Sequence, residues 1–378
     1  MSGIYLHIPF CKQACHYCNF HFSTSMKGKA ELLNCMMKEL ELQKDYLSDK
    51  TVETIYFGGG TPSLLEADEI NLLIAQIDRH FNLIANPEIT LEANPDDLGR
   101  EKIKALKQSP VNRFSIGIQS FFDEDLKWMN RSHVGAEAED SVKRAQDAGF
   151  ENITADLIYG FPLLSDEKWR ANIQKMIQLQ IPHLSCYGMT VEEGTALHHF
   201  VKSGKSKQMD DGQGAGQFEI LMETSEAAGF LHYEISNFAQ PGKESKHNSN
   251  YWKGVHYLGV GPSAHSFNGS SRQWNVSNNP KYIEQLLVNE VPATIETLNV
   301  EDRFNEYIMT SLRTMWGADV NYIGKEFGSD FKQNLLQKAH VFLDKNWLSI
   351  ENDHLLLSRQ GKMFADHIAA ELFEIIHE

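Results

Sequence analysis

Short apolar runs alternate with helix-like segments through the first half of the chain. The runs are rich in β-branched and aromatic side chains, which is typical of buried strands; they cover residues 4–8, 54–57, 88–92, 113–118, 153–158 and 183–187. Between them, apolar side chains recur at helical spacing, for example around residues 70–81, 103–106 and 169–177. Strands that alternate with helices predict parallel βαβ units, and hence an α/β barrel or a doubly wound sheet.

The pattern changes in the second half. Residues 201–216 are rich in Gly, Ser, Lys, Gln and Asp, which predicts a loop or linker where the barrel ends. Residues 236–279 are also loop-rich, but their many aromatic and histidine side chains indicate more than a connection. From Val300 the pattern predicts three helices, a hairpin within residues 347–357 and a last helix. We interpret this order as a winged-helix-like appendage.

Charge and hydropathy narrow the class of protein. Lys and Arg number 35 against 51 Asp and Glu, a formal charge of −16, so most of the surface would repel a phosphate backbone. The appendage shows no basic recognition face either, and we expect no nucleic-acid partner. No apolar run approaches a membrane-spanning length, and the start lacks the features of a signal peptide. We therefore expect a cytoplasmic location.

Three of the five cysteines stand within eight residues, as Cys11, Cys15 and Cys18 in a C-x3-C-x2-C pattern. Soft thiolates suit an iron–sulfur cluster or zinc. Three cysteines on a four-iron cluster leave one iron open for a further ligand. The alternative is a zinc site with His16 or His21 as fourth ligand. The other two cysteines, Cys35 and Cys186, lie among apolar residues and are most simply packed thiols.

A glycine run, Gly58-Gly59-Gly60-Thr61-Pro62, follows the second predicted strand. Glycines let backbone groups approach a ligand without an intervening Cβ. With the cysteine triad after the first strand, this run makes the chain resemble radical S-adenosylmethionine (SAM) enzymes. More narrowly, it resembles the oxygen-independent coproporphyrinogen oxidase family, from Tyr5-Leu-His-Ile-Pro-Phe-Cys11 to the C-terminal appendage.

The resemblance implies a fold and a chemistry. We expect a partial (β/α)6 TIM-like barrel over residues 1–235, a connecting segment over 236–295, and a HemN-type winged-helix-like domain over 296–378. It further implies a [4Fe-4S] cluster on Cys11, Cys15 and Cys18. In that family the SAM amino and carboxylate groups chelate the open iron, and an electron from the cluster yields a 5′-deoxyadenosyl radical.

Polar residues follow several of the predicted strands at the edge where a parallel barrel binds its ligand. By resemblance, the SAM pocket would contain Tyr5, Tyr17, Gly59, Gly60, Thr61 and Glu92. A second SAM would lie against Gln119, Arg131 and Asp156. Taken singly, each of these last three has a structural alternative: Gln119 as a helix cap, Arg131 as a partner of a surface acid, and Asp156 as a buried, hydrogen-bonded carboxylate.

Two departures from the oxidase pattern favour a related branch. Asn19-Phe20 stands where the oxidase has a further cysteine, and the long segment that precedes the first strand in the oxidase is absent. Both features resemble the HemW-type haem chaperones. The run His247-Asn-Ser-Asn-Tyr-Trp252 matches the H-N-x-x-Y-W pattern of that branch, whose histidine binds haem. His265, His7 and His256 are rival ligands.

We therefore expect a haem chaperone that carries a [4Fe-4S] cluster and SAM, and that hands haem to haem-receiving apoproteins, with respiratory proteins and a dimeric assembly as candidates. No residue is assigned a catalytic role. The alternative is a porphyrin-biosynthesis enzyme that oxidatively decarboxylates coproporphyrinogen III. A zinc-dependent or DNA-binding regulator is disfavoured by the acidic charge and the Gly58–Thr61 motif.

Overall fold

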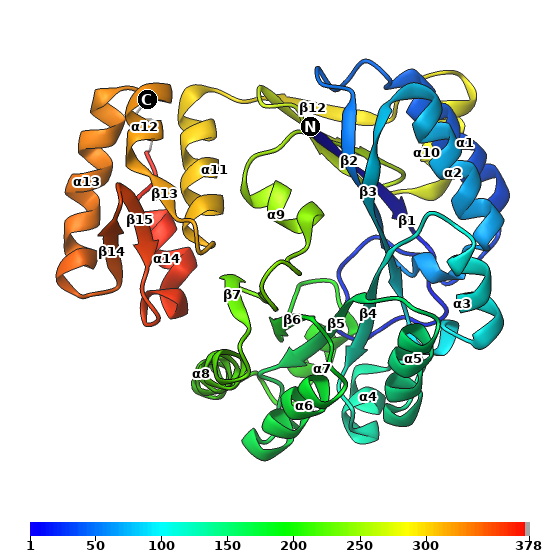
Figure 1. The fold of residues 1–378 in the computed structure, drawn as a ribbon, viewed down its shortest axis with the longest axis horizontal. Coiled ribbons are helices and arrows are strands. Elements are labelled where there is room, and N and C mark those ends of the chain that lie inside the picture. Colours follow the sequence, from blue (N-terminus) through cyan, green and yellow to red (C-terminus); the bar gives the residue numbers. More distant parts are fainter. Residues whose placement is uncertain (375–378) are drawn as a thin grey trace.

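The computed structural model describes residues 1–374, and its largest element is a curved twelve-stranded sheet (Figure 1). Its strand order is β12-β11-β10-β9-β1-β2-β3-β4-β5-β6-β8-β7. The six central strands pair in parallel: β1 (Ser2–Ile8), β2 (Thr51–Gly59), β3 (Asn82–Ala93), β4 (Arg113–Gln119), β5 (Asn152–Tyr159) and β6 (His183–Gly188). These are the six strands that the sequence predicts, and they form a partial α/β barrel.

Helices cover the outer side of this sheet (Figure 1). They are α1 (Lys29–Leu42), α2 (Ala67–His80), α3 (Arg100–Lys107), α4 (Asp123–Met129), α5 (Gly135–Asp147) and α6 (Asp166–Gln178). The apolar stripe of α2, with Ile70, Leu73, Ile74 and Ile77, is buried as its 3.6-residue period predicts. A capping box between Glu66 and Glu69 starts the helix.

Both edges of the parallel sheet are extended by further strands, most of them antiparallel. At one edge β8 (Asn237–Ala239) pairs with β6, and β7 (Leu231–Glu234) pairs with β8. At the other edge β9 (Tyr257–Val260) pairs in parallel with β1, followed by β10 (His265–Phe267), β11 (Ser271–Asn275) and β12 (Ala293–Thr297). Residues 236–279, predicted to be loop-rich, thus contain several short strands between their turns and loops. These strands, of three to five residues, are too short to show a strand period on their own, and they are stabilised by pairing that starts at the barrel edge.

The predicted linker at 201–216 is also partly helical. After α7 (Ala196–Lys202), helix α8 (Asp211–Ala227) begins at Asp210, whose carboxylate accepts from the backbone N–H of Gln213. The side-chain oxygen of Gln217 accepts from the Gly160 N–H at 2.8 Å, and the backbone carbonyl of Gln217 accepts from Trp169 Nε1. These contacts with the barrel outweigh the low helix propensity of the glycines in the first turns.

The C-terminal domain has its own apolar core, which includes Phe304, Ile308, Leu335 and Phe342. It consists of α11 (Val300–Leu312), α12 (Val320–Glu326), α13 (Ser329–Asp344), the hairpin β14 (Leu348–Glu351) and β15 (His354–Leu357), and α14 (Ala365–Glu371). This is the predicted order of elements. A two-residue strand, β13 (Ala318–Asp319), adds to β15 and was not predicted. The predicted domain end at 378 lies outside the described residues.

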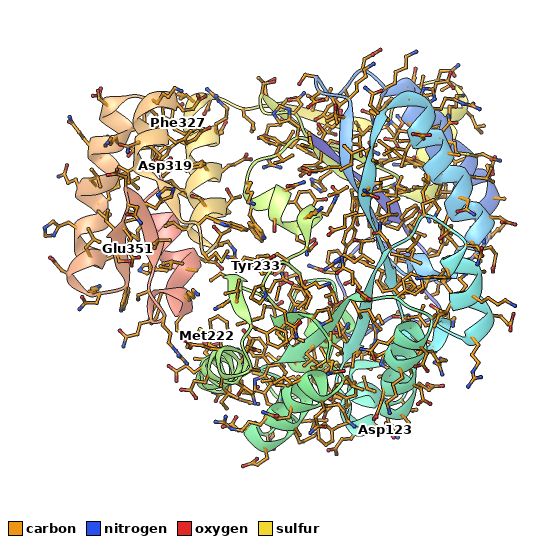
Figure 2. All side chains as sticks on the ribbon, viewed as in Figure 1. Asp123, Met222, Tyr233, Asp319, Phe327 and Glu351 are labelled. Atoms are coloured by element: carbon orange, nitrogen blue, oxygen red, sulfur yellow. The ribbon has the colours of Figure 1, made fainter. Side chains whose placement is uncertain are left out.

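Several contacts join this domain to the barrel. Helix α9 (Lys246–Trp252) packs against both β2 and α11, and in Figure 1 it lies between them. Tyr233 on β7 lies at the junction (Figure 2), where its carbonyl accepts from the Met315 N–H at 3.0 Å. Helix α10 (Asn279–Leu287) packs on α1 at the other side of the barrel. Within the described residues, no helix is long and apolar enough to cross a membrane.

Candidate cluster and cofactor site

The cysteine loop leaves β1 and is fixed by backbone hydrogen bonds to neighbouring segments. The Cys11 N–H donates to the Ser23 carbonyl and the His16 N–H to the Met129 carbonyl, each at 3.0 Å. The side-chain amide of Asn130 donates to the Ala14 carbonyl at 2.7 Å. All three thiols of the loop are partly exposed, whereas Cys35 and Cys186 are buried, as predicted for packed thiols.

Hydrogen-bond donors face two of the three sulfurs. Arg131 Nη1 donates to Cys15 Sγ at 3.2 Å, and Thr61 Oγ1 donates to Cys11 Sγ at 3.5 Å. Burial raises the pKa of Cys18 to about 11 and that of Cys11 above its usual value. Bound iron would replace the thiol protons, and the two donors would then stabilise sulfur that carries negative charge. The donor set therefore fits an iron–sulfur cluster.

The two histidines of the zinc alternative each have one ring nitrogen engaged in a hydrogen bond. His16 Nδ1 bonds the Trp128 carbonyl at 2.8 Å, and His21 Nε2 bonds Asn279 Oδ1 at 2.7 Å. In residues 1–374 no group of three or more His, Cys, Asp or Glu side chains surrounds a single ion position. A zinc ion needs its ligands around one point, but each thiolate of a four-iron cluster binds a different iron. The arrangement therefore favours a cluster over zinc.

Glu92, at the end of β3, is held by two donors. Its carboxylate accepts from the Tyr56 hydroxyl at 2.8 Å and from the Gly59 N–H at 3.2 Å. Burial raises the pKa of this carboxyl to about 7. The ring of Tyr5 lies beside Gly58, where a Cβ would stand 2.8 Å from it. The structure thus brings Glu92, Tyr5 and the glycine run together at the carboxyl ends of β1–β3.

The glycine run joins the strand end to the cysteine loop. A Cβ at Gly60 would stand 2.6 Å from the Phe10 carbonyl oxygen, and one at Gly59 would stand 2.7 Å from the His7 ring. The Thr61 N–H donates to that same Phe10 carbonyl at 2.7 Å. The first role of these glycines is therefore to let the run pack closely on the chain segment that enters the cysteine loop.

Arg131 and Gln119 lie together over the end of β4. A Cβ at Gly117 would stand 3.0 Å from Gln119 Nε2 and 3.2 Å from Arg131 Nη2. Arg131 Nη2 also donates to Asn94 Oδ1 and to the Gly117 carbonyl. Gln119 Oε1 and Arg131 Nε are buried without a hydrogen-bond partner among the described residues. Arg131 is thus no partner of a surface acid, and the pair presents unsatisfied polar atoms for a ligand.

Asp156 and Tyr17 complete the predicted set. Asp156 Oδ1 accepts from Ser115 Oγ at 3.5 Å, and burial raises the pKa of its carboxyl to about 7. Tyr17 lies near Arg131, and burial raises the pKa of its hydroxyl well above the usual range. Two half-buried acids, Glu92 on β3 and Asp156 on β5, therefore lie on strands on either side of β4, near enough for the charge of Asp156 to raise the pKa of Glu92.

Two residues of this pocket were missed by the sequence analysis. Asn94 accepts from Arg131 and donates to Thr61 Oγ1 at 3.5 Å, so it links the arginine to the glycine run. Its position two residues after Glu92, at a strand end, could have identified it. Gly117 leaves room for Arg131 and Gln119, and no local pattern distinguishes it from other strand glycines.

The structure buries His247, the predicted haem ligand, on α9. Its Nδ1 bonds Thr54 Oγ1 and its Nε2 bonds the Tyr251 hydroxyl, each at 2.8 Å. The side chain is 1% exposed, and burial lowers its pKa to about 3. Both ring nitrogens are therefore engaged in this conformation, and binding of iron by His247 requires that one of these bonds break.

A cavity of about 1050 Å³ separates the barrel from the C-terminal domain. The barrel side contributes Tyr5 of the predicted SAM pocket, Phe20 next to the cysteine loop, and Tyr251. The other wall comes from Tyr307 on α11 and from Tyr322 and Phe327 on or after α12; Figure 2 marks Phe327. Four histidines also line it: His7, His21, His256 and His265. The cavity is large, aromatic and in contact with the predicted cofactor pocket.

Comparison with known proteins agrees with this geometry. Residues 5–176 match the model of the radical SAM superfamily, and residues 298–364 match that of the HemN C-terminal domain. The coproporphyrinogen III oxidase HemN of Escherichia coli, a radical SAM enzyme, superposes with a TM-score of 0.85 at 19% identity, over 98% of this chain and 89% of that one. The fold and site thus define a radical SAM protein with a HemN-type C-terminal domain.

The sequence relatives identify the branch. The heme chaperone HemW of Bacillus subtilis is 32% identical over 97% of this chain and 98% of its own length. HemW of Lactococcus lactis is 34% identical over 95% and 94%, and that of Escherichia coli is 36% identical over 70% and 69%. This chain belongs to the HemW family.

Proposed function

We propose that this chain is a haem chaperone that binds haem and passes it to haem-dependent apoproteins. Membership of the HemW family supports the proposal, because relatives named heme chaperone HemW match this chain over nearly its full length and nearly all of their own. The observation that carries it in this chain is the cavity of about 1050 Å³ beside the cysteine loop. Aromatic side chains and histidines line it, which suits a flat apolar ring with a metal at its centre.

The chain's own residues suit the two cofactors that the family implies. Cys11, Cys15 and Cys18 would hold the cluster, and Glu92 would accept hydrogen bonds from the SAM ribose. A bound cluster supplies electrons and an open iron for the SAM amino and carboxylate groups. Tyr5 lies beside Gly58 of the proposed SAM pocket and also lines the large cavity. SAM binding that moves Tyr5 would therefore change one wall of the cavity.

His247 stays a proposed haem residue with a structural condition. Its Nε2 bonds Tyr251, and Tyr251 itself lines the large cavity. Helix α9 also contacts the C-terminal domain. A shift of α9 would therefore free His247 and change one wall of the haem cavity in the same step.

An anaerobic assay separates chaperone from oxidase. Reconstituted protein is given haem, and transfer to an apo-haemoprotein is followed. A second sample receives coproporphyrinogen with SAM and a reductant. We expect stable haem binding, transfer to the acceptor, and no protoporphyrinogen. Formation of protoporphyrinogen would instead establish the oxidase, and failure to bind haem would end the proposal. The receiving proteins and a dimeric assembly stay predictions.

A further inference from the structure

One wall of the large cavity is a face of β9, β10 and β11, three neighbouring strands of the twelve-stranded sheet. In the antiparallel register His265 of β10 stands opposite Trp274 of β11, and Phe267 stands opposite both Arg272 of β11 and Tyr257 of β9. Because directly opposed side chains share a face, these five form one surface. Ring contacts confirm it: Arg272 lies 4.7 Å over the Phe267 ring, and His265 stacks with Trp274 at 6.2 Å.

Of the four histidines that line the cavity, His265 alone is both exposed and without a ring hydrogen bond among the described residues. His7 has both ring nitrogens bonded, to Tyr5 and to the His21 carbonyl, and His21 bonds Asn279. The Nε2 of His256 faces the turn at Gly269, where a Cβ would stand 2.6 Å away. His265 is exposed, and within residues 1–374 its ring makes no hydrogen bond.

Arg272 provides the complementary charge on the same face. His265 and Arg272 are diagonal neighbours in the register, a relation that places two residues about 7–8 Å apart. The span from haem iron to a propionate carboxylate is similar. Arg272 already binds one carboxylate, that of Glu306 on α11, through Nε and through Nη2 at 2.9 Å. A propionate is the same functional group and can occupy the same donor fork.

We propose that His265 is an axial ligand of the haem iron and that Arg272 binds a haem propionate. The proposal deepens the haem-chaperone function and rests on it. The porphyrin lies over Phe267 and Tyr257, with the aromatic side chains of the C-terminal domain on its other side. The lone pair of neutral His265 forms the iron–nitrogen bond, and no electron or proton transfer is needed. Burial, and next the charge of Arg272, lowers the pKa of His265, which favours that neutral form.

The test uses full-length protein that carries its cluster, titrated with ferric haem. The optical difference spectrum and the low-spin electron paramagnetic resonance signal report the axial ligand. We expect His265→Ala to lose the histidine-ligated spectrum and to bind haem at least tenfold more weakly. Added imidazole should restore the histidine-ligated spectrum. The control is His340→Ala, an exposed histidine of α13 outside the cavity, which keeps both the spectrum and the affinity. His265→Met would change the spectrum to that of a sulfur ligand, a result that a structural role would not give.

The propionate contact is tested with haem and its dimethyl ester. Esterification weakens binding to the unaltered chain, but Arg272→Ala binds the two forms equally, because the partner of the charge is gone. A His265→Ala spectrum and affinity equal to those of the unaltered chain would overturn the ligand assignment. Failure of the unaltered chain to bind haem would instead overturn the chaperone function itself. SAM binding by each variant confirms that it has folded.

Discussion

At the scale of single residues, the three thiols of the cysteine loop differ from the other two by exposure. We expect Cys11→Ala, Cys15→Ala or Cys18→Ala to lose the cluster, because one iron would lack its protein ligand. Iron and acid-labile sulfide should fall from about four each per chain to well below two. Cys35→Ala is the matched control, since this thiol is buried on α1. Equal loss in the control would contradict the assignment.

Glu92 gives a prediction about pH. Burial raises the pKa of its carboxyl to about 7, so the ionised form that accepts both ribose hydroxyls is lost as pH falls below 7. We expect SAM to bind about tenfold more weakly at pH 6 than at pH 8, as measured by calorimetry on the reconstituted protein. At pH 8, Glu92→Gln should weaken SAM binding about tenfold or more, since a hydrogen bond to a charged group is lost.

A second acid provides the control for this pH profile. Burial also raises the pKa of Asp156 to about 7, so the profile alone does not identify the group. Asp156→Asn should keep a pH dependence of SAM binding with its midpoint at lower pH, because the charge of Asp156 adds to the raised pKa of Glu92, whereas Glu92→Gln should flatten it. The opposite pair of results would move the ribose contact from Glu92 to Asp156.

At the scale of elements, helix α8 contains glycines that its fold does not require. Gly216 is exposed inside the helix, and a Cβ there would meet nothing within 4 Å. Gly216→Ala should therefore raise the free energy of unfolding by about 1 kcal/mol. Gly160, at the end of β5, has φ +78°, and Gly160→Ala should lower it by about 1–2 kcal/mol. Denaturant unfolding measures both free energies. If Gly216→Ala lowered the free energy of unfolding as Gly160→Ala does, the helical assignment of residues 211–216 would be contradicted.

These elements also show what a sequence can predict. Strands β1–β6 are buried on both faces, so they appear as apolar runs and could be predicted from them. Helix α8 could not, because Gln217 and its contacts with Gly160 and Trp169 decide its conformation. Strand β9 could not either, because it pairs with β1, which lies far away in the sequence, and β10 and β11 build outward from it.

The candidate site follows the same division. Glu92, Gln119 and Asp156 could be found because ligands of parallel sheets bind at the carboxyl ends of strands. The contacts of Arg131 with Cys15 and Asn94 join segments more than 30 residues apart, which no local pattern reveals. The burial of His247 against Thr54 is of the same kind. The sequence motif identifies His247 as a candidate, but only the packing shows that both of its ring nitrogens are already hydrogen-bonded.

At the scale of the whole molecule, Arg272 and Glu306 connect the two halves across the large cavity. Arg272 belongs to the extended barrel sheet and Glu306 to α11 of the C-terminal domain, and both are partly exposed. If haem propionate and Glu306 compete for Arg272, binding of the cargo breaks a contact between the domains. Return of Glu306 to Arg272 would then help to expel the cargo, which a chaperone must release.

The two partners of this ion pair should consequently have opposite effects on haem affinity. Glu306→Gln removes the competitor, so haem should bind about fivefold more tightly, which corresponds to ~1 kcal/mol for a partly exposed pair. Transfer to an apo-haemoprotein should slow by a similar factor. Arg272→Ala removes the binding partner, so haem should bind more weakly and leave faster. If the ion pair only held the domains together, both variants would shift affinity in the same direction. Stopped-flow measurement of haem release from each variant distinguishes the two cases by sign.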